Sequence, residues 1–247
     1  MTKRATKLVG TATKVLGPKI IEATPQVSGA AIHVALLRAI SGYGPLPGAA
    51  EAAQKQHDEQ HGDAERAIHE VIENNVLWAT GGGLLTNLGG VITAAVAIPA
   101  NITTLAIIQC RMVAGIAHLR GYDLSDPRVH NAIMATLLGE DRVKKRVKKK
   151  KLPAHPAEIA TAPSYDPHLD VLVGAEVAAE LFTRMAGKRA VGGTAKKVPI
   201  IGGIVGAVTD GIATYRVGRY AAREFVVPLK ALPEPKTGRR ALRAQAH

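Results

Sequence analysis

The stretch NNVLWATGGGLLTNLGGVITAAVAIPANITTLAIIQC, residues 74–110, carries no charged side chain, whereas Asp, Glu, Lys and Arg make up 21% of the whole chain. Such a run must be buried in protein or in lipid. The glycines at 81–83 and Pro99 interrupt it, so we predict two helices, residues 84–98 and 99–119. At about 1.5 Å per residue the first helix is shorter than the roughly 30 Å hydrocarbon core of a bilayer. That length favours a core helix or a re-entrant segment.

The composition indicates an unusual core. Hydrophobic residues make up 47% of the chain, but only one Trp, two Phe and five Tyr are present. Packing must therefore rest on Ala, Val, Ile, Leu and Gly, which let helices approach closely. Helical periodicity recurs and extended alternation is absent, so we predict an all-α fold. The predicted fold is a compact multi-helix bundle with Gly- and Ala-rich hydrophobic central helices and no significant β-sheet.

The remaining helical patterns and the linkers between them suggest the organisation of the chain. Further helices are predicted at residues 2–16, 26–40, 49–60, 63–75, 127–138, 169–185 and 200–227. Ser125, Asp126 and Pro127 form a cap followed by a first-turn proline. We divide the chain into N-terminal amphipathic and polar helices (1–62), a helical core (63–227) with a basic segment and Pro-rich loop (142–168), and a disordered basic tail (228–247).

The N-terminus and the single cysteine bear on the compartment. The first residues are basic but lack a continuous apolar stretch and a signal-peptide cleavage site. Cys110 excludes an internal disulfide, which fits a reducing compartment, and its apolar neighbours predict a core position. We expect a cytoplasmic protein, peripheral to the inner face of the cell membrane.

The net charge of +12 is concentrated in two segments. One is a run of eight basic residues without an acid: Arg142, Lys144, Lys145, Arg146, Lys148, Lys149, Lys150 and Lys151. The other is the N-terminus, with Lys3, Arg4, Lys7, Lys14 and Lys19. The run fits a solvated charged segment, a contact with anionic lipid, or a contact with nucleic acid. It contains no aromatic residue for base stacking, and no helix-turn-helix or zinc-finger pattern is present.

A second basic stripe lies on the C-terminal helical segment. Arg216, Arg219 and Arg223 share one face, which suits phosphate or anionic lipid, intramolecular ion pairs, or plain solvation.

Polar residues within the apolar helices predict a buried polar core with a structural or ligand-binding role. Its members are Asn101, Gln109, Arg111, His118, Asp210 and Tyr215. Asp210 lies among small residues and needs a partner. We predict that it pairs with Arg111, or with Arg120 as second choice.

The segment HDEQH, residues 57–61, is the best candidate for a metal site. His57 and His61 are four residues apart, and Glu65 or His69 would complete the ligand set. The zinc-protease pattern requires Glu directly after the first His, whereas Asp58 stands here. An exposed polar helix is the alternative interpretation. Elsewhere the sequence shows no nucleophile or phosphate-loop pattern, and we expect no cofactor.

Three segments resemble the EcsC family of bacterial proteins: PANITTLAIIQCRMVAGIAHLRGYD (99–123), LSDPRVHNAIMATLLG (124–139) and IIGGIVGAVTDGIATYRVGRYAAREF (200–225). The resemblance covers about residues 75–227. It implies an all-helical structure and a relative encoded beside an ABC transporter, so a membrane transporter is an expected partner.

Together these patterns favour a non-enzymatic protein that docks on anionic lipid at the cytoplasmic face of the membrane. The basic run and the N-terminal lysines would supply the charge, and a hairpin around residues 84–108 would insert partly into lipid. Two alternatives are a metal-dependent hydrolase with a His57/His61 site and a nucleic-acid binder that uses the basic run.

Overall fold

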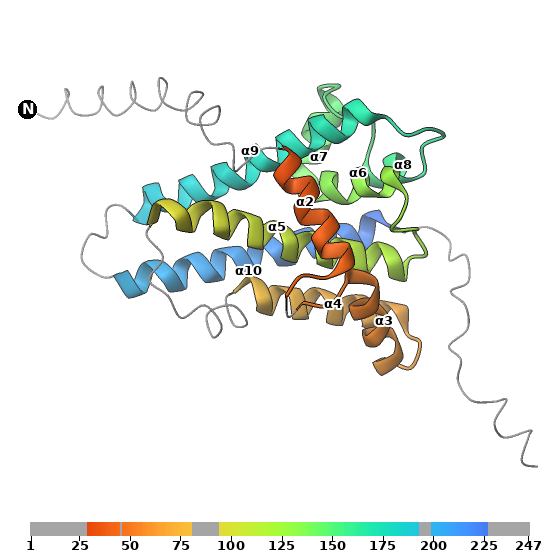
Figure 1. The fold of residues 1–247 in the computed structure, drawn as a ribbon, viewed down its shortest axis with the longest axis horizontal. Coiled ribbons are helices and arrows are strands. Elements are labelled where there is room, and N and C mark those ends of the chain that lie inside the picture. The colour runs from red at the N-terminus through yellow and green to blue at the C-terminus, as the bar shows by residue number, and fades with distance from the viewer. Residues whose placement is uncertain (1–28, 45, 81–93, 193–198, 227–247) are drawn as a thin grey trace, which may run out of the picture.

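The computed structural model describes residues 29–44, 46–80, 94–192 and 199–226, without the side chains of 94–102 and 185–207. These residues form helices joined by turns and contain no strand, which confirms the all-α prediction (Figure 1). The helices are α2 (Gly29–Ser41), α3 (Ala49–Glu59), α4 (Ala64–Ala79), α5 (Ala94–Leu119), α6 (Pro127–Thr136), α7 (Glu140–Lys148), α8 (Pro156–Ala160), α9 (Pro167–Gly192) and α10 (Pro199–Glu224).

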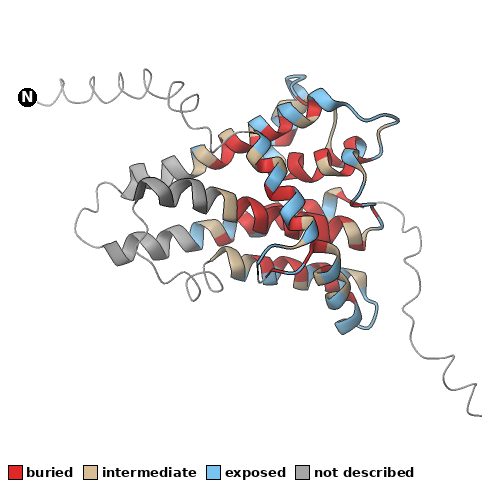
Figure 2. Ribbon diagram, viewed as in Figure 1, coloured by how far each residue is buried: buried red, intermediate tan, exposed pale blue. Residues whose placement is uncertain are grey.

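Helix α5 is the centre of the bundle, and α2, α3, α4, α6, α9 and α10 all contact it. Its side chains from Leu105 to Ala117 are almost all buried, among them Cys110, whose core position is confirmed. Figure 2 shows this buried centre in red. The described carboxyl-terminal part of the uncharged run is thus buried in protein. Leu105, Ile107 and Ile108 belong to the core, so the expected lipid-inserting hairpin is wrong for these residues.

The predicted helix start at Pro99 is also wrong. Helix α5 begins at Ala94 and continues through Pro99 to Leu119. A proline this close to the amino end removes only one intrahelical hydrogen bond, and the packed turns that follow hold the helix. None of the helices in the described residues is both long and apolar enough to cross a bilayer. The predicted helices at 2–16 and most of 84–98 lie outside the described residues.

Close packing of α10 against its neighbours depends on two glycines seven residues apart. A Cβ atom on Gly218 would lie 2.9 Å from Ile72 of α4 and 2.9 Å from Met112 of α5. A Cβ atom on Gly211 would lie 2.6 Å from Thr80. Helix α10 therefore approaches α4 and α5 closely, which fits the close helix contacts expected from the small-residue composition.

The predicted helix boundaries agree best where a cap marks them. The Asp126 side chain accepts a hydrogen bond from the Arg128 backbone N–H, with Pro127 in the first turn of α6. Asp63 caps α4 in the same way, although α4 extends to Ala79, beyond the predicted end. Helix α9 is also longer than predicted, and the Pro-rich loop contains the short helix α8.

Candidate anion-binding surface

Most of the basic run forms helix α7, a short helix with charges arranged along its axis. Gly139, with φ of 82°, turns the chain out of α6, and Glu140 and Asp141 occupy the first turn of α7. Basic residues fill the last turn, so both ends complement the helix dipole. Val143 is fully buried and anchors the helix to the core. Residues 142–148 of the run are therefore helical, and Lys149, Lys150 and Lys151 follow the end of the helix.

Two arginines of the run turn toward α9 and are neutralised there. Arg142 Nη2 lies 2.8 Å from Glu180 Oε2, and Arg146 pairs with Glu176. The carboxylate of Glu180 is only 8% exposed, and it also accepts a hydrogen bond of 2.9 Å from Arg184 Nε. A buried carboxylate held by two guanidinium groups fixes both arginines in place.

A third acid links α7 to α10. Glu140 accepts a hydrogen bond of 2.7 Å from Lys144 Nζ and a second one from Arg223 Nη2. These two bonds, the one from Lys144 first, hold the pKa of the Glu140 carboxyl below its usual range. Four residues predicted to bind anions therefore have intramolecular carboxylate partners: Arg142, Lys144, Arg146 and Arg223.

Beside these contacts lies a cavity of about 440 Å³, formed by the turn between α6 and α7 together with α7, α9 and α10. Five arginines line it, namely Arg142, Arg184, Arg216, Arg219 and Arg223. Glu140 and Asp141 are the acids in its wall. Arg216 and Arg219 are exposed, and within the described residues neither side chain has an ion pair or a hydrogen bond. The cavity thus has a positive surplus, with two guanidinium groups available to a ligand.

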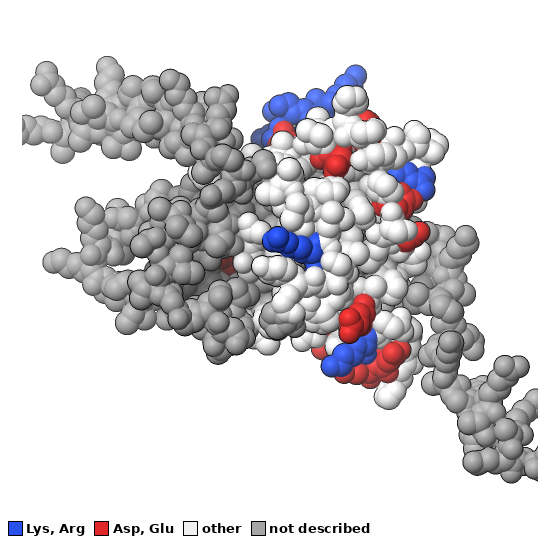
Figure 3. All heavy atoms as spheres, in the orientation of Figure 1, with Lys and Arg blue, Asp and Glu red and all other residues white. Residues whose placement is uncertain are grey.

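Lysines extend this positive surface beyond the cavity. Five lysines of the basic run are exposed and have no ion pair in the described part of the chain: Lys145, Lys148, Lys149, Lys150 and Lys151. Figure 3 shows Lys and Arg side chains gathered along the upper edge of the molecule, beside α7 and α9. We call these lysines and the arginine-lined cavity together the basic surface.

The predicted polar core is only partly buried. Gln109 is fully buried and donates to Thr214 Oγ1 at 3.1 Å, while His118 and Asp210 are half-buried. Tyr215 is 44% exposed and lines the arginine cavity, so its predicted burial is wrong. It follows the buried Thr214 directly and is therefore turned about 100° from that residue around the helix axis. The Asn101 side chain lies outside the described residues.

Arg111 has other partners than the predicted Asp210. Its Nε donates to the Pro47 carbonyl at 3.0 Å and its Nη1 to Asn75 Oδ1 at 3.0 Å. Arg120 pairs with Glu65. No ion pair among the described residues joins Asp210 to either arginine, so the predicted pairing is wrong. The packing of α4 between α3 and α10 brings Asn75, instead of Asp210, to the guanidinium.

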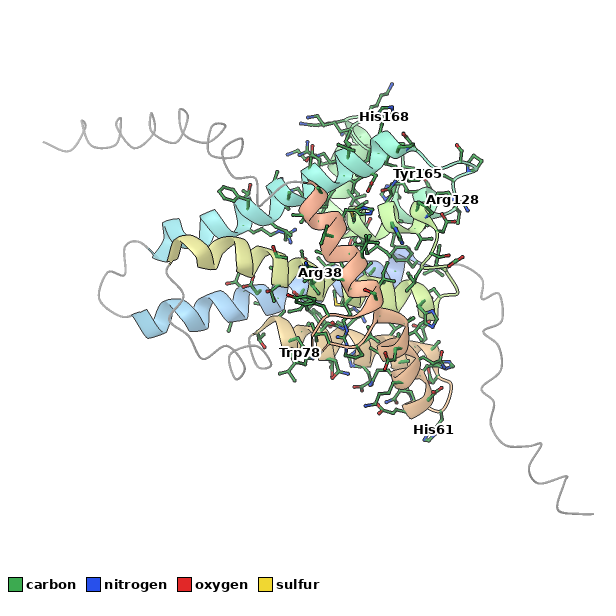
Figure 4. All side chains as sticks on the ribbon, viewed as in Figure 1. Arg38, His61, Trp78, Arg128, Tyr165 and His168 are labelled. Carbon is green, nitrogen blue, oxygen red and sulfur yellow. The ribbon has the colours of Figure 1, made fainter. Side chains whose placement is uncertain are left out.

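The two histidines of the predicted metal site do not share a helical face. Helix α3 ends at Glu59, and His61 has φ of 56° in the turn that follows. His57 is 6% exposed, whereas His61 is exposed at the tip of that turn (Figure 4). Among the described residues, no group of three His, Cys, Asp or Glu side chains is placed to hold a metal ion.

Arg184 and the acids of α9 are absent from the predicted site residues, although the sequence contains a signal for the acids. Glu176 and Glu180 are four residues apart, as are Arg142 and Arg146. Such spacing puts the two acids on one face of α9 and the two arginines on one face of α7, so each arginine can pair with one acid when the helices are neighbours. The order of the two ion pairs follows from α7 and α9 running in opposite directions.

Comparison with known proteins supports the family resemblance. No curated protein and no solved structure matches the chain. The family model described as EcsC protein family matches residues 1–227, which extends the resemblance over α2 and α3 and over the HDEQH segment. The chain therefore belongs to the EcsC protein family.

Proposed function

We propose that the protein docks on anionic lipid at the cytoplasmic face of the membrane and performs no chemistry of its own. The observation that carries the proposal is the arginine-lined cavity, in which Arg216 and Arg219 have no ion pair or hydrogen bond with the described residues. Helix α7, which lines the cavity with Arg142, also carries exposed lysines. Guanidinium groups form paired hydrogen bonds with phosphate oxygens. Each lysine or arginine near an anionic leaflet contributes about 1 kcal/mol.

The ion pairs of α7 support this proposal in a second way. They neutralise Arg142, Arg146 and Arg223 but also hold α7 against α9 and α10. The remaining cations thereby stay on one rigid surface instead of a flexible segment. Tyr215 at the cavity adds a ring with a polar tip, the side-chain type enriched at membrane interfaces.

Apolar insertion of residues 105–108 is not part of the mechanism, because these residues are buried inside the bundle. The proposal therefore rests on electrostatic docking, which salt weakens. The screening length falls from about 10 Å at 0.1 M ionic strength to about 3 Å at 1 M. Binding should be strong on anionic vesicles at low salt and lost at high salt.

Flotation of the full chain with vesicles tests this. Vesicles of phosphatidylcholine with phosphatidylglycerol should carry the protein upward at low salt, and pure phosphatidylcholine vesicles should not. Protein that stays at the bottom with anionic vesicles at low salt would overturn the proposal. Retention on vesicles after a high-salt and alkaline wash would contradict peripheral docking.

A membrane transporter is the proposed protein partner. Membership of the family supports it, since the resemblance implies a relative encoded beside an ABC transporter. Crosslinking in intact membranes, followed by identification of the joined proteins, checks it. Recovery of soluble proteins alone would argue against a transporter.

A further inference from the structure

A second cationic site lies away from the basic surface, at Arg111 of α5. The side chain is 8% exposed and is held by two neutral acceptors, the Pro47 carbonyl and the Asn75 amide oxygen. Asn75 Nδ2 donates to the Val71 carbonyl at 2.7 Å, which directs its amide oxygen toward the guanidinium. The orientation of Arg111 is therefore fixed from both sides.

No Asp or Glu of the described residues pairs with this buried charge. Neither acceptor is charged, and no Asp or Glu lines the adjacent cavity. Burial lowers the pKa of Arg111, and no carboxylate acts in the opposite direction. The second terminal nitrogen, Nη2, donates to no atom of the described residues. Nη2 is not among the fully buried side-chain atoms without a partner, so a ligand can reach it, and a half-paired guanidinium without a carboxylate beside it favours an external anion.

The cavity beside Arg111 has the size and lining of a small-ligand site. Its volume is about 150 Å³, the space of about five water molecules. Lys55, Gln56 and Asn74 contribute polar groups, and Lys55 is exposed at the surface. Trp78, beside the connection between α2 and α3 in Figure 4, and small side chains of α3 form an apolar wall.

We propose that this cavity binds a small organic carboxylate, with the carboxylate on Nη2 of Arg111 and the apolar part of the ligand against Trp78. One buried guanidinium matches the single charge of a carboxylate in a planar, paired contact. A phosphate group has up to two charges and three strong acceptor oxygens. The guanidinium of Arg111 already donates to Pro47 and Asn75, so its remaining N–H groups cannot satisfy all of these oxygens. The apolar wall suits a short aliphatic or aromatic tail. The site is independent of the proposed membrane function.

Calorimetric titration of the full chain with sodium acetate, sodium benzoate and sodium phosphate at constant ionic strength tests the proposal. Acetate or benzoate should bind saturably with one site per chain. Arg111→Met removes the charge and keeps most of the volume, so the carboxylate affinity should fall at least about tenfold. Arg38→Met removes an exposed arginine of α2 elsewhere and should leave the affinity unchanged.

Ala52→Leu provides a second variant that keeps Arg111 and its two hydrogen bonds. The larger side chain fills the cavity, so it should abolish carboxylate binding while the circular dichroism spectrum stays that of the wild type. Absence of saturable acetate or benzoate binding to the wild type would overturn the proposal. So would equal affinities in the wild type and Ala52→Leu, or saturable binding of phosphate alone.

Discussion

Gln109 illustrates how a single polar side chain is accommodated in an apolar core. It is fully buried in α5, and its amide nitrogen donates to Thr214 of α10, while its Oε1 accepts no hydrogen bond from the described residues. The side chain therefore depends on one partner, since a buried amide without a hydrogen bond is costly.

Thr214→Val should destabilise the protein by about 1–3 kcal/mol, because the shape is kept while the Gln109 donor loses its acceptor. Urea unfolding followed by circular dichroism measures the change. The double variant Gln109→Leu with Thr214→Val should recover part of this loss. A single variant as stable as the wild type would show that the bond contributes nothing.

His118 makes the stability depend on pH. Burial first, and repulsion from His57 second, lower its pKa below the ordinary histidine value of 6.5. The unfolded chain therefore binds a proton that the folded chain resists, and protonation favours unfolding. The contribution of neutral His118 to the free energy of unfolding is complete above about pH 6.5 and is lost as the pH falls below that value.

We expect the free energy of unfolding to decrease from pH 7 to pH 5.5 and the decrease to be smaller in His118→Gln. Urea titrations at each pH measure both slopes. His69→Gln is the matched control, because His69 is exposed on α4. Identical slopes in the wild type and His118→Gln would contradict the assignment.

The glycines at helix crossings differ in the atoms that pack against them, which are backbone atoms at one crossing and side chains at another. At the crossing of α2 and α9, a Cβ atom on Gly174 would lie 2.9 Å from the backbone oxygen of Gly29. At the crossing of α10 with α4 and α5, a Cβ atom on Gly218 meets side-chain atoms of Ile72 and Met112. Backbone atoms cannot move aside, whereas long side chains can change rotamer.

Gly174→Ala should therefore destabilise more than Gly218→Ala. Alanine gains about 1 kcal/mol of helix propensity at each site, and overpacking costs about 1–3 kcal/mol where side chains adjust. Thermal unfolding of both variants in parallel ranks them. Equal melting temperatures would show that α2 and α9 separate as easily as side chains repack.

The overall bundle was largely predictable because its signals are local. The apolar periodicity around Leu105 and the cap at Asp126 depend on neighbours in sequence, and both features are present in the structure. Pro99 was misjudged, since tertiary packing of α5 outweighs one missing hydrogen bond.

The candidate site was predictable only in part. The face shared by Arg216, Arg219 and Arg223 follows from helical spacing, and all three line the cavity. That this face meets α7 and Arg184 depends on contacts between residues far apart in the chain. A sequence shows that a charge such as Arg111 needs a partner, but packing decides which partner it has.

Considered as a whole, the molecule combines a densely packed core with a basic surface at its α7 and α10 side. The central claim is that the unpaired arginines of that surface contact anionic lipid. Arg216→Gln with Arg219→Gln removes two charges and, since neither side chain has a partner within the described part of the chain, should leave the fold intact.

The most direct test is the dissociation constant for phosphatidylglycerol-containing vesicles at 0.1 M salt, measured for this double variant and for Arg38→Gln with Arg66→Gln, which removes the same charge elsewhere. Each removed charge should cost about 1 kcal/mol of binding free energy, so we expect Arg216→Gln with Arg219→Gln to weaken binding roughly 30-fold. The control pair should change the dissociation constant little. Equal weakening by both pairs, or none by the first, would contradict the account.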